Sequence, residues 1–314
     1  MEKNRYYPLA AVLLAVILWG LSFLSIKVTL IVLPPMTQAF IRFSIASLVL
    51  YVLLKYNEPG VKLDKKDLPM TLLAGVLGIT LYFYFENNGV KLISASSASM
   101  IVATVPILTL IGDFIVFKSP LTKKKIISVI LSVIGVYFIV GAGSNGQQSE
   151  STWFGYLMMF GATIAWVVYT IMTKSLFNKY SELVIVYYQT IFGTVALLPF
   201  AIFEKTNWSA VTDSIVLNLV FLGVFCSALA NYFYVYAMEK IGVSICSLLM
   251  NFVPVVTVIA SYFILKESIA LSQLLGGLLV ITAVYICNLE KEEPPADIPI
   301  SIPMEVVYPG EKEI

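Results

Sequence analysis

Charged residues interrupt this chain only at intervals, and the stretches between them are apolar and nearly as long as a membrane-crossing helix. A bilayer core requires about 20 apolar residues per helix, because backbone polar groups must be satisfied inside the helix. Such charge-free runs cover 8–26, 68–85, 92–112, 126–149, 151–173, 183–203, 214–238, 241–265 and 268–289. A further run, 35–54, contains a single charge, Arg42. The pattern predicts an all-α integral membrane protein with ten transmembrane helices.

The basic residues predict how these helices are oriented. If the N-terminus is cytoplasmic, most Lys and Arg residues fall in cytoplasmic segments, such as 55–66 and 118–125. The predicted outer loops carry only Lys91, Lys205 and Lys266. This distribution follows the positive-inside rule and predicts a multi-pass protein of the cell membrane with both termini in the cytoplasm.

The two halves of the chain resemble each other. A shift of about 147 residues places Trp19 over Trp166, and nearly the same shift places Pro106 over Pro254. Each half holds five predicted helices, and an odd number of crossings means that the second half enters the membrane from the opposite side. We therefore predict two inverted-topology five-helix repeats, 1–148 and 149–289. The tail, 290–314, is acidic and proline-rich, a composition that predicts disorder.

The segments 94–138 and 242–285 are similar to the drug/metabolite transporter superfamily, specifically its EamA-type ten-helix members. The second segment is the closer one, with Pro254, then Lys266-Glu267-Ser268-Ile269, then Gly276. The first segment keeps Pro106 but has Ser119 where the family pattern has Glu.

This resemblance implies a secondary transporter, often an exporter, that moves small organic metabolites such as amino acids by alternating access. It also implies a central cavity between the two halves. Alternatives are a transporter of cationic drugs or choline-like amines, and a membrane receptor or scaffold that transports nothing. The chain has no G-x-x-x-x-G-K-[ST] loop for ATP, so a substrate or ion gradient would supply the energy.

Composition narrows the chemistry further. The chain is 59% hydrophobic and 12% charged and contains no histidine, whereas soluble domains carry about 25% charged residues. Without histidine, a C-x-x-C pair or a recognised nucleophile arrangement, we expect no enzyme activity, no cofactor and no metal site. A net charge of +1 gives no basic surface for nucleic acid. The expected partners are a small-molecule substrate, the lipid bilayer and protons as a coupling ion, and the protein is expected to be a monomer or a homodimer.

Charges at membrane depth are costly and therefore mark candidate functional residues. Glu86 could exchange a proton or hold a cation. It could instead be a wetted carboxylate at a helix end, or a partner for nearby Lys91. Arg42 could be a structural or hinge residue that clamps neighbouring helices, or it could recognise an anion. Lys27 and Lys174 lie near helix ends, where snorkelling explains them.

The remaining candidates are aromatic and amide residues within the predicted helices. Trp19 and Trp166 are expected near the midplane as a substrate-facing pair, with ordinary packing as the alternative. Tyr82, Asn231, Tyr232 and Asn251 are further substrate-binding candidates. Asn251 is the best neutral polar candidate, since an unsatisfied amide in hydrocarbon is costly. Pro106 and Pro254 are predicted hinges within the fourth and ninth helices, or else tolerated kinks.

Overall fold

The structure is a computed structural model that describes residues 6–117, 122–142, 150–174, 176, 179–241, 246 and 249–288. The long helices are α1 (Tyr6–Thr29), α2 (Pro35–Asn57), α7 (Lys123–Ala142), α8 (Glu150–Lys174), α9 (Glu182–Phe203) and α14 (Leu271–Asn288). Shorter helices follow one another as α3 (Leu68–Gly75), η1 (Val76–Leu81) and α4 (Tyr82–Leu92), then α5 (Ala95–Val102) and α6 (Val105–Phe117). The second half has η2 (Trp208–Ala210), α10 (Asp213–Val220), η3 (Phe221–Leu229), α11 (Ala230–Ile241), α13 (Phe252–Ala260) and η4 (Ser261–Leu265). The predicted tail, 290–314, lies outside the described residues.

The described chain is all-α, and its helices suit a bilayer. Within the described residues, seven stretches are long and apolar enough to cross a membrane: Tyr6–Thr29, Pro35–Asn57, Leu68–Leu92, Ala95–Gly112, Thr152–Thr173, Glu182–Phe203 and Asp213–Ala237. Two shorter apolar helices cover Phe252–Leu265 and Leu271–Cys287. Large apolar side chains such as Leu157, Val195 and Leu278 are exposed on the outside of the bundle. Apolar side chains exposed in this way are favourable where they contact lipid and unfavourable where they contact water.

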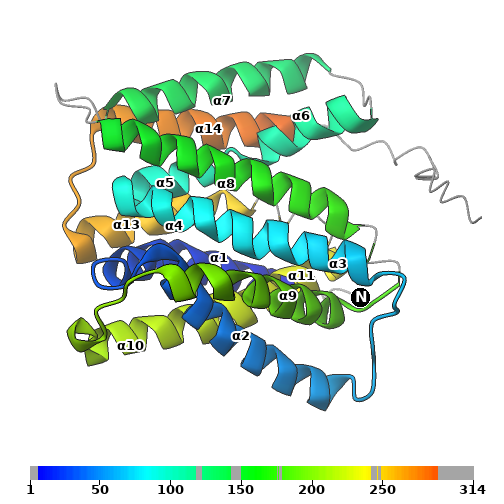
Figure 1. The fold of residues 1–314 in the computed structure, drawn as a ribbon. Helices are drawn as coiled ribbons and strands as arrows, with labels where there is room; N and C mark the ends of the chain where they lie inside the picture. The colour runs from blue at the N-terminus through cyan, green and yellow to red at the C-terminus, as the bar shows by residue number, and fades with distance from the viewer. Residues whose placement is uncertain are drawn as a thin grey trace, which may run out of the picture.

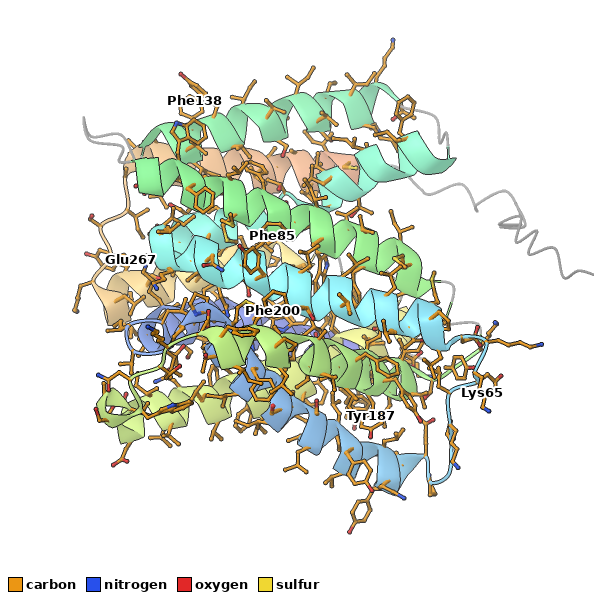
Figure 2. The ribbon with its side chains drawn as sticks, in the orientation of Figure 1. Lys65, Phe85, Phe138, Tyr187, Phe200 and Glu267 are labelled. Carbon is orange, nitrogen blue, oxygen red and sulfur yellow. The ribbon has the colours of Figure 1, made fainter. Side chains whose placement is uncertain are left out.

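The helices form an elongated bundle, with α7 and α14 side by side along one edge and α2 along the opposite edge (Figure 1). Figure 2 places Lys65 and Glu267 at opposite ends of this bundle. We call these ends the Lys65 end and the Glu267 end. The described chain begins at the Lys65 end, close to α3 (Figure 1).

The third apolar stretch is longer than the charge-free run predicted. The run stops at Phe85 because Glu86 is charged, but the helix continues through α4 to Leu92. The stretch also contains the π-helical turn η1, and the stretch formed by α10, η3 and α11 contains the π-helical turn η3. Wider turns of this kind inside α-helices occur frequently at functional sites.

Helices α2 and α9 run antiparallel and are joined at both ends. At the Glu267 end, the Glu204 carboxylate after α9 accepts hydrogen bonds from the backbone N–H groups of Met36 (3.1 Å) and Thr37 (2.6 Å) and from the Thr37 hydroxyl (2.9 Å). At the Lys65 end, the Glu58 carboxylate after α2 accepts a bond of 2.7 Å from Ser181, the N-cap residue of α9. Each helix start is therefore held by a carboxylate that follows the other helix, as the free N–H groups and dipole of a helix N-terminus favour.

Glu267 makes a similar contact with the start of α5. Its carboxylate accepts bonds from the backbone N–H groups of Ala95 (2.9 Å) and Ser96 (3.3 Å) and from the Ser96 hydroxyl (2.8 Å). Nearby, the Lys27 ammonium donates to the carbonyls of Val90 and Ile93 at the end of α4. The sequence suggested that Lys27 extends toward water. In the structure its ammonium instead binds the C-terminus of α4. The side chain of Lys174 lies outside the described residues.

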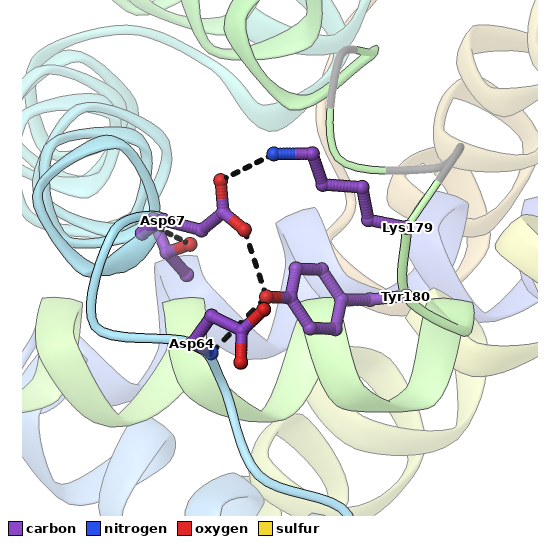
Figure 3. A network of polar contacts seen from close by, with 5 residues as sticks. Asp64, Asp67, Lys179 and Tyr180 are labelled. Carbon is purple, nitrogen blue, oxygen red and sulfur yellow. Dashed lines mark hydrogen bonds and ion pairs between the residues drawn. The ribbon is translucent and has the colours of Figure 1, made fainter.

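At the Lys65 end, two connections meet in a polar network (Figure 3). The Asp67 carboxylate accepts bonds of 2.8 Å from the Lys179 ammonium and from the Tyr180 hydroxyl, and the backbone N–H of Asp64 donates to the same hydroxyl oxygen. These hydrogen bonds hold the pKa of the Asp67 carboxyl below its usual range. The bond from Lys179 is the larger cause and the bond from Tyr180 the second. The network connects the segment before α3 to the segment before α9.

Candidate functional site

Two opposite charges lie buried between α2 and α4. Arg42 is 3% exposed and Glu86 is 4% exposed. Arg42 is seven residues after the start of α2 and Glu86 is six residues before the end of α4, which places both about 10 Å from the Glu267 end of their helices. Their charges interact, although no ion pair between described residues joins them.

The Arg42 side chain is held by three neighbours. Its Nε donates a hydrogen bond of 2.5 Å to the Ser227 hydroxyl on η3. Its guanidinium carbon lies 4.6 Å from the ring centre of Phe83 and 5.4 Å from that of Phe43. Its Nη1 has no hydrogen-bond partner among the described residues. A planar, fixed guanidinium with a free donor is suited to binding a carboxylate.

Glu86 has one satisfied oxygen and one free oxygen. Its Oε1 accepts a bond of 2.8 Å from the Tyr82 hydroxyl, one helical turn earlier. Its Oε2 is buried without a partner in the described part of the chain. The wetted helix-end carboxylate considered from the sequence is therefore wrong, since Glu86 is inside a helix and buried while Lys91 is exposed.

A polar pair extends this site toward the Glu267 end. Gln38 lies one turn before Arg42 on α2, and Asn87 follows Glu86 on α4. The Asn87 amide donates bonds of 2.8 Å to the Gln38 side-chain oxygen and to the Pro35 carbonyl. Both side chains are fully buried. Neither residue is charged, and neither was among the candidates predicted from the sequence, although the spacing of Gln38 and Arg42 places both on one helix face.

The aromatic candidates fall into two groups. The Trp166 ring centre lies 5.2 Å from that of Tyr82, and Tyr232 packs in the same cluster. Trp19 instead lies 5.1 Å from Tyr234, and its Nε1 donates a bond of 2.9 Å to the Cys226 carbonyl in η3. Only Trp166 thus adjoins Glu86, through Tyr82.

The amide candidates also differ in setting. The Asn231 amide donates a bond of 2.7 Å to the Ser227 carbonyl, one turn earlier in the same helical stretch. Asn251 immediately precedes α13 and is buried, and its Oδ1 has no partner among the described residues. Asn231 therefore approaches the Arg42 site through Ser227, whereas Asn251 precedes α13, which packs on α1 and α5.

The two prolines lie at helix starts rather than inside continuous helices. Pro106 is the second residue of α6, after the helix stops at Val102, and Pro254 is the third residue of α13. In the first helical turn the missing N–H of proline removes no hydrogen bond. The sequence located these interruptions but placed them in the middle of unbroken spans.

No group of three or more His, Cys, Asp or Glu side chains able to hold a metal occurs in the parts of the chain that the structure describes. The polar chemistry of the site thus consists of a guanidinium, a carboxylate, two amides and hydroxyl groups.

Comparison with known proteins identifies the family. The model of the EamA-like transporter family matches residues 7–141 and again residues 153–289. This chain belongs to the EamA-like transporter family. The EamA assignment also agrees with the apolar helices of the structure.

Curated proteins similar to this EamA chain are named as transporters. An "Uncharacterized transporter" of Archaeoglobus fulgidus is 29% identical over 273 residues, which cover 87% of this chain and 95% of that protein. The "Uncharacterized transporter YetK" of Bacillus subtilis is 29% identical and covers 94% of this chain and 90% of its own. A protein of Streptantibioticus cattleyicolor named "Probable terminal-alkyne amino-acid exporter" is 26% identical, with 88% and 92% covered.

A solved crystal structure has the same fold. It matches this EamA chain with a TM-score of 0.66 at 18% identity, covering 91% of this chain and 97% of the other. At this identity the likeness is one of fold alone.

Proposed function

We propose that this protein is a secondary active transporter that exports small organic metabolites such as amino acids by alternating access. The observation that carries this proposal is the pair Arg42 and Glu86, two partly unpartnered charges buried within an apolar bundle of a transporter family. Charges in such positions are costly and mark substrate or ion pathways. Transport of cationic drugs or choline-like amines, and ligand binding without transport, are the alternatives.

The architecture proposed is ten transmembrane helices in two inverted repeats, 1–148 and 149–289, with 290–314 as a tail. The reciprocal contacts at both ends of α2 and α9 support it, because inverted repeats place equivalent helices antiparallel. The turns η1 and η3 support it as well, since a shift of about 147 residues brings them into register. The Lys65 end and both termini are proposed to lie in the cytoplasm of a cell-membrane protein, an orientation that the positive-inside pattern supports.

In this mechanism the two halves rock about a shared cavity. The interruptions before Pro106 and Pro254 give the fourth and ninth spans places to bend. Trp19, Trp166, Tyr82, Asn231, Tyr232 and Asn251 are proposed to contact the substrate. The transporter would act as a monomer or a homodimer.

Glu86 is proposed to exchange a proton during transport. The groups that face it are Tyr82 on its own helix and Arg42 on α2. Replacing Glu86 with Gln keeps the shape of the side chain but removes its titration. We expect Glu86→Gln to flatten the pH dependence of transport in proteoliposomes, while Lys91→Gln, which removes an exposed charge from the same helix, leaves it unchanged. An unaltered pH profile in Glu86→Gln would exclude Glu86 from coupling.

The proposed function is tested by counterflow in proteoliposomes. Vesicles preloaded with an unlabelled amino acid should accumulate the labelled form, and an equal series with choline-like amines tests the first alternative. Saturable accumulation supports transport. Ligand binding without flux for any tested compound would instead favour a receptor or scaffold.

A further inference from the structure

Four buried polar atoms without partners lie on the contacting helices α2 and α4. They are Gln38 Nε2 and Arg42 Nη1 on α2, and Glu86 Oε2 and Asn87 Oδ1 on α4, and none has a hydrogen-bond partner among the described residues. The two on α2 are donors and the two on α4 are acceptors. The site therefore has a donor side, which includes a positive charge, and an acceptor side, which includes a negative charge.

The hydrogen-bond network fixes which amide atoms are free. Exchanging the nitrogen and oxygen of both amides would preserve the bond between Asn87 and Gln38. It would also direct the Asn87 oxygen at the Pro35 carbonyl, which can only accept. The observed assignment satisfies Pro35, so Gln38 presents a free N–H and Asn87 a free oxygen.

Free buried groups of this kind are unfavourable in the absence of a ligand. Most buried polar groups in proteins have partners, and those that lack one call for an explanation. Arg42 and Glu86 attract each other without touching, which leaves both charges incompletely compensated. A ligand that accepts on one side and donates on the other would satisfy all four atoms at once.

Resting on the proposed transport function, we propose that this site recognises the zwitterionic head group of an α-amino acid. The ligand carboxylate accepts from Arg42 Nη1 and Gln38 Nε2. The ligand ammonium donates to Glu86 Oε2 and Asn87 Oδ1. The Tyr82 ring, whose hydroxyl donates to Glu86, and the Trp166 ring packed against it offer an apolar surface for the ligand side chain. Arg42 is then a binding residue rather than only a structural one.

The wild-type protein tests this assignment directly. Purified protein is titrated with the common L-amino acids, and binding is followed as a rise in unfolding temperature. The amino acid that binds most tightly is then compared with its amide, which lacks the carboxylate, and with its deaminated acid, which lacks the ammonium. Each analogue should bind at least about tenfold more weakly, because either change leaves buried charged groups unpaired.

Two variants test the residues separately. In Arg42→Gln, the amino acid and its amide should bind within about threefold of each other, while the loss on deamination persists. In Glu86→Gln, the amino acid and its deaminated acid should bind within about threefold of each other, while the loss for the amide persists. Lys91→Gln is the matched control and should keep both differences. If Arg42→Gln does not fold, the wild-type analogue series and Glu86→Gln still decide.

The outcomes separate this inference from the transport proposal. Zwitterion binding without flux would support the site and overturn transport. Flux confined to amines or anions, with no zwitterion binding, would support transport and overturn the site. The proposed zwitterion site would also be overturned if the amide and the deaminated acid bind as tightly as the amino acid.

Discussion

The crossing of α7 and α14 depends on two glycines that face each other. A Cβ atom on Gly276 would lie 2.5 Å from the Gly135 carbonyl oxygen, and one on Gly135 would lie 2.7 Å from the Gly276 oxygen. Both neighbours are backbone atoms, so no side chain can move aside. We predict that Gly276→Ala destabilises the protein.

The magnitude follows from the geometry. Ordinary contact begins at 3.4 Å, so the two helices would have to separate by about 0.9 Å, and overpacking of this kind costs about 1–3 kcal/mol. Alanine also favours the helix over glycine by about 0.5–1 kcal/mol. The net loss expected therefore lies between about 0 and 2.5 kcal/mol, with a mid-range value of about 1 kcal/mol.

Gly112→Ala is the matched control. Its Cβ would meet side-chain atoms at 3.5 and 3.6 Å, which is ordinary contact. This variant should therefore be neutral or slightly more stable than the wild type. Both variants can be unfolded with SDS in mixed micelles and followed by tryptophan fluorescence. The close-crossing argument fails if Gly276→Ala is as stable as Gly112→Ala.

Two further predictions concern the ends of the bundle. Glu204→Ala removes three hydrogen bonds from the start of α2 and should lower the unfolding free energy by about 1–2 kcal/mol, with Glu204→Gln intermediate. Asp213→Asn, an exposed change at the start of α10, serves as the control, and an equal effect of Asp213→Asn and Glu204→Ala would contradict the capping role. The hydrogen bond from Lys179 lowers the pKa of the Asp67 carboxyl. The ionised Asp67 carboxylate therefore stabilises the folded protein fully above the ordinary pKa of about 3.9, and this stabilisation is lost as the pH falls through the lowered pKa. The stability difference between wild type and Asp67→Asn should accordingly be constant near neutral pH and shrink below about pH 4, and a difference independent of pH would refute this.

The sequence located most helices because the signal is local. Bilayer thickness sets the length of each apolar run, and a charge inside a run is conspicuous. The same reasoning misjudged the end of the third stretch, since it treated Glu86 as a boundary. A buried charge cannot be distinguished from a helix end by counting charges alone.

The apolar spans, the internal similarity of the two halves and the candidates Arg42 and Glu86 could thus be read from the sequence by itself. Only the tertiary structure brought Arg42 and Glu86 together, added Gln38 and Asn87, and separated Trp19 from the group around Trp166. Which side chains meet depends on how each helix is rotated about its axis. In a membrane protein the lipid-facing and core-facing sides of a helix are both apolar, so hydrophobic periodicity carries little information about that rotation.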